Sequence, residues 1–327
     1  MSGIDTIAVV GAGRMGHGIA LVYALDDHSV VLNDADAARL DSCQDRIAEA
    51  IDTLVDAGRV SETDARRTMD RIDPVDRLER AVRDADLITE AVTEDLSIKQ
   101  SIFEELDRHA PESAILATNT SSLSIDRITE PVDRRDRVLG THWFNPPYIV
   151  PLVEIVKGSE TSDRMVNSVS SVLDSAGKTP VVVQEDIPGF IGNRIQAAMS
   201  YEAFSLLERG VATPADIDKA VKASFGFRLP IMGIFSKMDQ SGLDIHYEVE
   251  AQLMPELDRG TEPNAVIEEL LAGGETGTDA GKGVYDWTET DLDAVYRERD
   301  QALLNVLEVY ESSSPTTPPA NYDRTGD

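Results

Sequence analysis

The sequence is poor in cysteine and contains no long apolar run. Cys43 is the only cysteine among 327 residues, which excludes an internal disulfide framework and a cysteine-based zinc site and fits a reducing compartment. No apolar run approaches the ~20 residues that a membrane-spanning helix needs. Met1 is followed within a few residues by a predicted strand, so we expect no signal peptide. Together these features predict a cytoplasmic protein without a membrane segment.

Positive charge is also scarce. The chain has 30 Lys and Arg against 60 Asp and Glu, a formal net charge of −30. Nucleic-acid binding is disfavoured, because affinity for a phosphate backbone comes mainly from clustered positive charge. The acidic residues are spread along the whole chain, which indicates a haloadapted protein, since in about 1 M salt the Debye length falls to ~3 Å and self-repulsion is screened. An acidic surface for a basic partner is the alternative, and the even spread argues against it.

Short apolar segments alternate with helical ones through the first half of the chain. We predict strands at residues 6–10, 29–33, 86–90, 114–118, 138–144, 152–156 and 180–183. Buried strands that alternate with helices favour an α/β fold with a doubly wound, mostly parallel sheet. A helical insertion at about residues 35–70 breaks at Ala57-Gly58 and restarts at a capping sequence that begins with Ser61.

The strand pattern ends shortly before the Pro188-Gly189 turn, and helical patterns follow it. We therefore predict a first domain over residues 1–186 and a smaller all-α domain over residues 187–311. Residues 312–327 are rich in proline and polar side chains, and they are predicted to form a disordered tail.

A glycine-rich turn follows the first strand and opens the first helix. It contains Gly11, Gly13 and Gly16 in the pattern G-x-G-x-x-G, and Asp34 ends the next strand. In this context the pattern predicts a Rossmann-type dinucleotide site, where backbone N–H groups at the helix N-terminus meet the pyrophosphate. Asp34 would bind the ribose 2′-hydroxyl and repel a 2′-phosphate. NAD is therefore the predicted cofactor, although Arg14 within the loop is a weak signal for NADP.

Two polar residues stand in apolar strands, where each is costly unless they meet. The strand that contains His142 ends at Pro146-Pro147, because proline cannot donate to a sheet ladder. His142 would therefore emerge where α/β sheets keep their active sites. Glu154 lies in the next strand, where an unpaired carboxylate is costly to bury. We interpret the pair as an imidazole that takes a proton and a carboxylate that orients it. The alternative is a core histidine and a separately satisfied glutamate.

With these motifs in this order, the chain resembles the 3-hydroxyacyl-CoA dehydrogenase family, including its short-chain 3-hydroxybutyryl-CoA members, from about Ile4 to Trp287. The segments that carry the resemblance are the glycine turn, Glu90–Lys99, Asn119–Leu123, the His142 run with Glu154, Asp186–Arg194, Gly242–Asp244 and Gly281–Trp287. Each segment alone could be an ordinary cap or a solvated helix face. Their shared order and spacing make the resemblance specific.

The resemblance implies a reversible, NAD-dependent oxidation of an L-3-hydroxyacyl-CoA, as in fatty-acid β-oxidation or short-chain acyl-CoA metabolism. It implies that His142 is the general base, that Glu154 orients it, and that Ser121 and Asn193 hold the reacting oxygen. Glu94 and Lys99 would line the nicotinamide ribose. The residues implied to contact NAD are Gly11, Gly13, Met15, Gly16, Asp34, Glu94, Lys99, Asn119 and Asn145. A homodimer formed through the helical domain is also implied.

The substrate is less constrained. CoA is polyanionic, and Arg59 and Arg67 in the helical insertion are candidates to meet its phosphates, although they could instead balance nearby acids. The loop Gly233–Lys237 and Val284 depart from the family's pattern. A dehydrogenase of a free hydroxy acid, similar to gulonate or carnitine dehydrogenases, is therefore the alternative. The other histidines show no metal-ligand spacing, so no metal site is predicted.

Overall fold

The computed structural model describes residues 3–313, so residues 1–2 and 314–327 lie outside the described part. The chain divides into two compact units, the first ending at Arg194 and the second beginning at Ile195. The boundary predicted at residue 186 lies earlier. The difference has a physical reason, because the backbone at Ile191 and Gly192 is hydrogen-bonded to Glu154 of the first unit.

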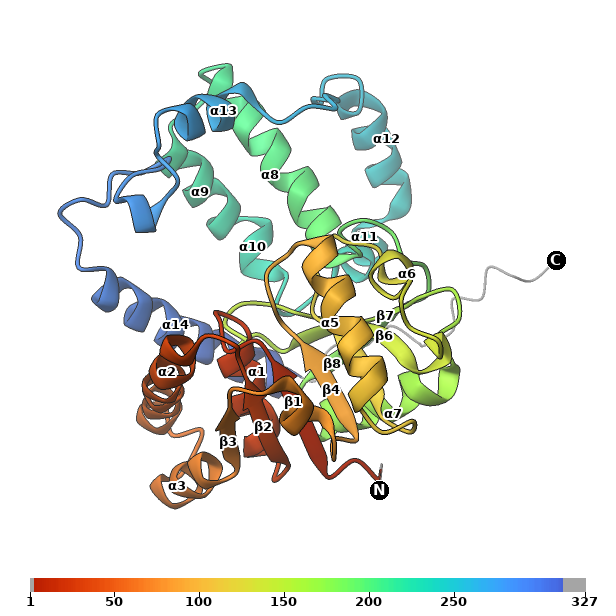
Figure 1. Ribbon diagram of the computed structural model, residues 1–327. Helices are drawn as coiled ribbons and strands as arrows, with labels where there is room; N and C mark the ends of the chain where they lie inside the picture. Colours follow the sequence, from red (N-terminus) through yellow and green to blue (C-terminus); the bar gives the residue numbers. More distant parts are fainter. Residues whose placement is uncertain (1–2, 314–327) are drawn as a thin grey trace. The chain divides into compact units, whose positions relative to one another are not determined.

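An eight-stranded sheet runs through the N-terminal unit (Figure 1). Its strands are β1 Thr6–Val10, β2 Ser29–Asn33, β3 Ile72–Val75, β4 Leu87–Glu90, β5 Ile115–Thr118, β6 Val138–Trp143, β7 Leu152–Lys157 and β8 Thr179–Val183. The spatial order is β3-β2-β1-β4-β5-β6-β7-β8. The first six strands in this order are parallel, whereas β7 is antiparallel to β6 and β8 is parallel to β7. The predicted α/β fold with a mostly parallel sheet is confirmed.

Both faces of the sheet are covered, which explains the continuous apolar strands. Along β1, Ile7 and Val9 face one layer while Ala8 and Val10 belong to the core cluster on the other, and all four are buried. The helices of this unit are α1 Gly16–Leu25, α2 Ala37–Asp56, α3 Glu62–Asp70, α4 Leu78–Val82, α5 Leu96–His109, α6 Ile125–Ile128 and α7 Asp163–Ser175, with a short 3₁₀ turn at Arg135–Arg137.

The helical insertion comprises α2 and α3. Asp36 caps α2, and Ser61 caps α3 by accepting a hydrogen bond from the Asp64 N–H. Between them Gly58 has φ +69°, a conformation that glycine adopts without strain. The strand β3 was not predicted. It carries Pro74 and lies at the edge of the sheet, the place where a strand tolerates a proline.

The C-terminal unit is helical, as predicted. Its helices are α8 Gly192–Glu208, which begins in the first unit, α9 Pro214–Ala223, α10 Phe225–Arg228, α11 Ile234–Ser241, α12 Leu243–Leu253, α13 Ala265–Ala272 and α14 Leu292–Ser312, with a 3₁₀ turn at Thr278–Ala280. Single antiparallel bridges join Gly277 to Lys282 and Lys282 to Asp286. The predicted tail began at Ser312, but that residue ends α14, and the rest of the tail from residue 314 lies outside the described residues.

Within residues 3–313, no helix combines the length and the apolar character that crossing a membrane would require. In the same range no group of three or more His, Cys, Asp or Glu side chains is arranged to hold a metal ion.

Candidate active site

The sheet places His142 directly opposite Glu154. The two residues are cross-strand partners in the antiparallel pair β6–β7. Their side chains are buried, with 4% and 0% of their surfaces exposed. His142 Nδ1 lies 2.6 Å from Glu154 Oε2. The cost of burying each of these polar side chains in an apolar strand is therefore offset by the hydrogen bond between them.

The second oxygen of Glu154 is held by backbone. Glu154 Oε1 accepts hydrogen bonds from Ile191 N at 3.0 Å and from Gly192 N at 2.8 Å, where α8 begins. Gly189 and Phe190 precede this turn with φ +76° and +50°. A Cβ on Gly192 would lie 2.7 Å from the Phe144 ring, so only glycine brings the backbone this close. The positive end of α8 thus meets the carboxylate.

These contacts keep Glu154 ionised. Burial alone would raise the pKa of Glu154, but hydrogen bonds from His142 and from the N–H groups of Gly192 and Ile191 outweigh burial, and the pKa is lowered. A carboxylate only accepts hydrogen bonds, so it places the ring hydrogen of neutral His142 on Nδ1. The other ring nitrogen, Nε2, is then the atom available to take a proton.

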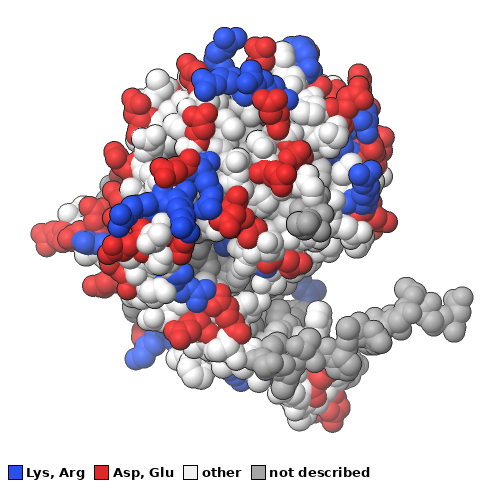
Figure 2. All heavy atoms as spheres, turned by 90° about the horizontal axis from the view of Figure 1, so that it is seen from below, with Lys and Arg blue, Asp and Glu red and all other residues white. Residues whose placement is uncertain are grey.

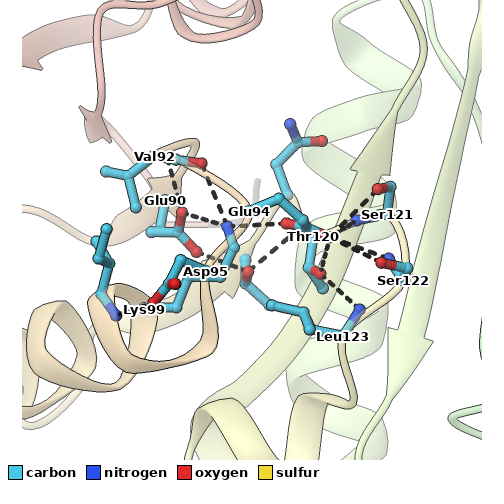
Figure 3. Close-up of polar contacts among 12 residues, drawn as sticks. Glu90, Val92, Glu94, Asp95, Lys99, Thr120, Ser121, Ser122 and Leu123 are labelled. Atoms are coloured by element: carbon cyan, nitrogen blue, oxygen red, sulfur yellow. Dashed lines mark hydrogen bonds and ion pairs between the residues drawn. The ribbon is translucent and has the colours of Figure 1, made fainter. Parts of the chain in front are cut away.

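The loop that follows β5 is organised by Glu94. Its Oε1 accepts hydrogen bonds from Thr120 Oγ1 at 2.7 Å, from Ser121 N at 2.9 Å and from Ser122 N at 3.1 Å. The hydroxyl of Ser121 donates to the same oxygen at 3.2 Å. These hydrogen bonds and the ammonium of Lys99 outweigh burial, so the pKa of Glu94 is lowered. Figure 3 shows the three polar residues of the loop gathered around this carboxylate.

Lys99 lies behind Glu94 rather than at the surface. Only 1% of Lys99 is exposed. Its Nζ is 2.7 Å from Glu90 Oε1 and 3.5 Å from Glu94 Oε2. Glu90 itself is wholly buried at the end of β4. Direct contact of Lys99 with a ribose therefore stays a prediction. Of Lys99 and Glu94, only Glu94 has an exposed side chain.

The glycine turn fits a dinucleotide. Gly11 has φ +104°, and a Cβ there would lie 2.7 Å from Ala91 O. A Cβ on Gly16 would lie 1.7 Å from Gly11 O, whereas nothing lies within 4 Å of the Cβ position of Gly13. The close contacts therefore require glycine at positions 11 and 16. Gly13 leaves the backbone at the start of α1 uncovered, so that a pyrophosphate could approach it closely.

Asp34 lies beside this turn at the end of β2. Its Oδ2 accepts a hydrogen bond from Ala12 N at 2.9 Å, and its Oδ1 accepts one from Asp36 N at 3.0 Å. The guanidinium of Arg39 is 3.9 Å from Asp34 Oδ2. The carboxylate is thus fixed at the carboxyl ends of β1 and β2, where the ribose of a dinucleotide lies in this fold.

The remaining predicted residues gather at the same edge of the sheet. Met15 is the N-cap of α1. Asn119 Oδ1 accepts a hydrogen bond from Trp143 N at 2.9 Å, which ties the end of β5 to the end of β6. Asn145 is exposed just beyond β6, and Asn193 is a half-buried residue in the first turn of α8. The structure therefore brings the candidate catalytic and cofactor residues to one edge of the N-terminal unit.

Arg59 and Arg67 lie elsewhere. The helix α2 leaves the Asp34 edge and, with 20 residues, extends about 30 Å toward the opposite edge. There α3 leads into β3, and Val30 N donates to Arg71 O at 2.9 Å (Figure 1). Arg67 is exposed and pairs with Asp64 at 3.6 Å. On the face drawn in Figure 2, basic side chains lie beside acidic ones, as such pairs require.

Two parts of the site were not predicted from the sequence. One is the pair of N–H groups at Ile191 and Gly192, which a sequence does not display. The other is Glu90, a carboxylate in an apolar strand. The same signal singled out Glu154, and it could have been applied to Glu90 as well.

Two family models match this chain over most of its length. Residues 6–187 match "3-hydroxyacyl-CoA dehydrogenase, NAD binding domain". Residues 189–287 match "3-hydroxyacyl-CoA dehydrogenase, C-terminal domain".

Known proteins resemble the chain over nearly all of its length. It is 31% identical to the 5-formyl-3-hydroxy-2-methylpyridine 4-carboxylate 5-dehydrogenase of Mesorhizobium japonicum, over 94% of this chain and 99% of the relative. A solved structure of a dehydrogenase with this substrate, described as an NAD⁺-dependent dismutase, has a TM-score of 0.89, with 30% identity over 94% of this chain and 99% of that one. The (S)-3-hydroxybutyryl-CoA dehydrogenase of Ralstonia eutropha has a TM-score of 0.72, with 33% identity over 87% of this chain and 99% of that one.

Proposed function

Because this chain belongs to the 3-hydroxyacyl-CoA dehydrogenase family and is an NAD-dependent oxidoreductase acting on a CH–OH group, we propose that it oxidises an L-3-hydroxyacyl-CoA reversibly to the 3-oxoacyl-CoA. The observation that carries the proposal is the buried hydrogen bond of 2.6 Å between His142 Nδ1 and Glu154 Oε2. It supplies a base whose free nitrogen is Nε2 and a fixed carboxylate behind it.

His142 is the proton acceptor in this proposal. A bound NAD would supply the acceptor for the hydride that leaves the carbon bearing the hydroxyl. His142 Nε2 removes the hydroxyl proton, and Glu154 stabilises the imidazolium that results. The amide of Asn193 donates a hydrogen bond to the substrate oxygen as negative charge develops on it. The Ser121 hydroxyl does the same by turning from Glu94 to that oxygen, while the Ser121 N–H stays on Glu94. In the reverse direction, protonated His142 returns the proton to that oxygen.

The cofactor residues follow from the same edge of the sheet. Gly11, Gly13, Met15 and Gly16 would hold the pyrophosphate at the start of α1, and Asp34 the adenosine ribose. Glu94, Lys99, Asn119 and Asn145 are proposed to form the nicotinamide end, with Lys99 acting from behind Glu94. The open backbone at Gly13 supports this arrangement.

A second candidate is a dehydrogenase of a small hydroxy acid that is not a CoA thioester. The TM-score of 0.89 to the dehydrogenase of a formyl-substituted pyridine carboxylate, against 0.72 for the hydroxybutyryl-CoA enzyme, favours a substrate without CoA. That this candidate substrate carries a hydroxyl group is our own proposal. The altered loop Gly233–Lys237 is a second reason to test this candidate. Both candidates use the same His142 and Glu154 chemistry and differ only in what surrounds the reacting carbon.

The experiment that separates them is NADH oxidation by the purified protein in concentrated KCl. Acetoacetyl-CoA, a longer 3-oxoacyl-CoA and free acetoacetate are compared, with His142→Gln as the inactive variant and His109→Gln, at the C-terminal end of α5, as its matched control. CoA-dependent turnover that only the first variant loses supports the thioester proposal. Turnover of a free keto acid without CoA dependence overturns it in favour of the second candidate.

Arg59 and Arg67 remain proposed contacts for the CoA phosphates. Their place at the far end of α2 requires the nucleotide part of CoA to lie about 30 Å from the Asp34 edge. Replacing both with glutamine should raise the KM for acetoacetyl-CoA several-fold and leave the KM for NADH unchanged. An unchanged KM for the thioester removes these two residues from the site.

We also propose that the protein is a homodimer formed through its C-terminal unit. Large apolar side chains are exposed there, with Phe227, Phe235 and Tyr247 at 73%, 82% and 75%. Exposed apolar surface of this kind marks interfaces. Light scattering should give the mass of two chains, and Phe235→Glu with Tyr247→Glu should give the mass of one.

A further inference from the structure

Glu90 and Lys99 form a buried ion pair that the proposed reaction does not use. Their side chains are 0% and 1% exposed, and Glu90 Oε1 is 2.7 Å from Lys99 Nζ. Taking two charges out of water is costly, and a buried pair is weak support for stability because apolar residues of similar volume often serve as well. The pair therefore calls for an explanation beyond folding.

The contacts of Glu90 lead to the loop that carries Ser121. Through Oε1, Glu90 holds Lys99, whose ammonium lies 3.5 Å from Glu94 Oε2. Through Oε2, it accepts a hydrogen bond of 2.7 Å from Thr118 Oγ1. Thr118 Oγ1 in turn accepts one of 3.2 Å from Thr120 N. One carboxylate thus reaches the loop by two routes.

The two routes meet at Glu94. Thr120 Oγ1 donates to Glu94 Oε1 at 2.7 Å, and the same oxygen accepts from the N–H and the hydroxyl of Ser121. The chain of contacts therefore closes into a ring that contains Glu90, Lys99, Glu94, Thr120 and Thr118. Figure 3 shows this network passing from the end of β4 through the start of α5 to the loop after β5.

We propose that Glu90 is a positioning residue that fixes Ser121 through this ring. The inference rests on the proposed function, in which Ser121 donates to the substrate oxygen. Lys99 has two carboxylates to balance, and Glu90 binds it at the shorter distance. Without the charge of Glu90, the ammonium would be left to Glu94 and would draw that carboxylate toward itself and away from Ser121. Glu94 then no longer holds the Ser121 N–H, and Ser121 leaves the position from which its hydroxyl can turn to the substrate oxygen.

Glu90→Gln is the sharpest change because it keeps the shape of the side chain. Glu90 accepts from Val92 N at 2.7 Å, from Lys99 and from Thr118. A glutamine amide has one oxygen for these three donors, and its NH₂ group must face at least one of them. We expect kcat to fall about 10- to 100-fold, the usual effect of misplacing a reacting group. The KM for NADH should rise as well, because Glu94 and Lys99 are proposed contacts of the nicotinamide end.

A double-mutant cycle tests whether the effect passes through Ser121. In the Ser121→Ala background, Glu90→Gln should lower kcat by less than about twofold, because residues that act as a unit are not additive. A merely structural role would give the same factor in both backgrounds and would overturn the proposal. Thr118→Val, which removes only the second route, provides the same cycle if Glu90→Gln does not fold.

The matched control is Asp107→Asn, which breaks a partly buried ion pair of α5. Asp107 Oδ1 lies 2.7 Å from Arg137 Nη2, and the Arg137 side chain is 2% exposed. This variant should lose thermal stability and retain kcat. If Asp107→Asn lowers kcat as much as Glu90→Gln does, the effect is one of general destabilisation and the proposal is wrong.

A readout without substrate separates this proposal from the proposed function. In the protein alone, hydrogen exchange at the amides of Ser121 and Ser122 should be faster in Glu90→Gln than in the wild type and unchanged in Asp107→Asn. Unchanged exchange in Glu90→Gln overturns the positioning role. Absence of wild-type turnover with every thioester and acid overturns only the proposed function.

Discussion

Glu154 and Glu90 are two buried carboxylates of one sheet, and they differ in what they hold. Glu154 is hydrogen-bonded to an imidazole and to two backbone N–H groups. These three hydrogen bonds are kept whether the imidazole is neutral or charged. Glu90 faces an ammonium that is buried with it. The first arrangement suits a charge that appears during a reaction, and the second suits a charge that is always present.

The largest effect should come from Glu154→Gln. The amide leaves no carboxylate to orient neutral His142 or to stabilise its charged form, so kcat should fall about 10³-fold, within the range for loss of acid–base catalysis. The loss of stability should be smaller than for Lys99→Met, since the N–H groups of Ile191 and Gly192 can still donate to the amide oxygen. Steady-state NADH oxidation measures the effect.

Glu160→Gln is the control for that variant. Glu160 follows β7 on the surface, with its side chain 60% exposed and 3.8 Å from Arg135. It should retain wild-type kcat. Retention of activity by Glu154→Gln would mean that the two buried carboxylates do not differ as described.

Lys99→Met should instead be costly in stability. It leaves Glu90 buried without its cation, and breaking one side of a buried pair typically costs about 3 kcal/mol or more of the free energy of unfolding. Urea denaturation at neutral pH measures the loss. The double variant Glu90→Gln with Lys99→Met should recover a large part of it, and failure to do so would show that Lys99 stabilises the fold by other contacts.

Asp34 extends the comparison to a carboxylate at the cofactor edge. Asp34→Ser should remove the repulsion of a 2′-phosphate, while Arg39, 3.9 Å away, remains to attract it. The preference for NADH over NADPH in kcat/KM should fall about 10- to 100-fold, an amount typical of losing one charged contact. Adding Arg39→Gln should withdraw any gain with NADPH. An unchanged preference would place cofactor choice outside this residue.

The smallest effect concerns pH. The pKa values of Glu154 and Glu94 are lowered from 4.5 because hydrogen bonds to each carboxylate outweigh its burial. The unfolded state therefore binds more protons in acid, so this stabilisation is present above pH 4.5 and is lost as pH falls through the lower folded values. Thermal melts of Glu154→Gln should show a shallower loss below pH 4.5 than the wild type. A parallel loss would assign the acid sensitivity to other carboxylates.

Much of the fold was predictable because its signals are local. The glycine turn, the apolar strands, the helix cap at Ser61 and the break at Gly58 each depend on a few neighbouring residues. The strand β3 was missed because Pro74 disfavours a strand in the interior of a sheet, and the sequence does not show that β3 lies at the edge. The reversal of β7 was also missed, since an apolar strand shows no direction in its sequence.

The candidate site divides in the same way. His142 and Glu154 were predicted to meet because each is costly alone, and their contact is observed. The burial of Lys99 was not predicted, because a lysine on a helix ordinarily reaches solvent. Its environment depends on Glu90 at the end of β4 and on Thr118 at the end of β5. It also depends on the loop after β5, whose backbone conformation cannot be read from the sequence.

The reversal between β6 and β7 also has a consequence for the order of folding. His142 and Glu154 are 12 residues apart in the sequence, whereas Glu90 and Thr118 are 28 apart and Ala12 and Asp34 are 22 apart. Closing a shorter loop costs less entropy, and contacts of low sequence separation form more readily. We expect the strand pair that holds His142 and Glu154 to assemble before the longer parallel crossovers that bring Gly11 and Asp34 together. The chain would then carry the proposed base and its carboxylate before the proposed dinucleotide site has formed.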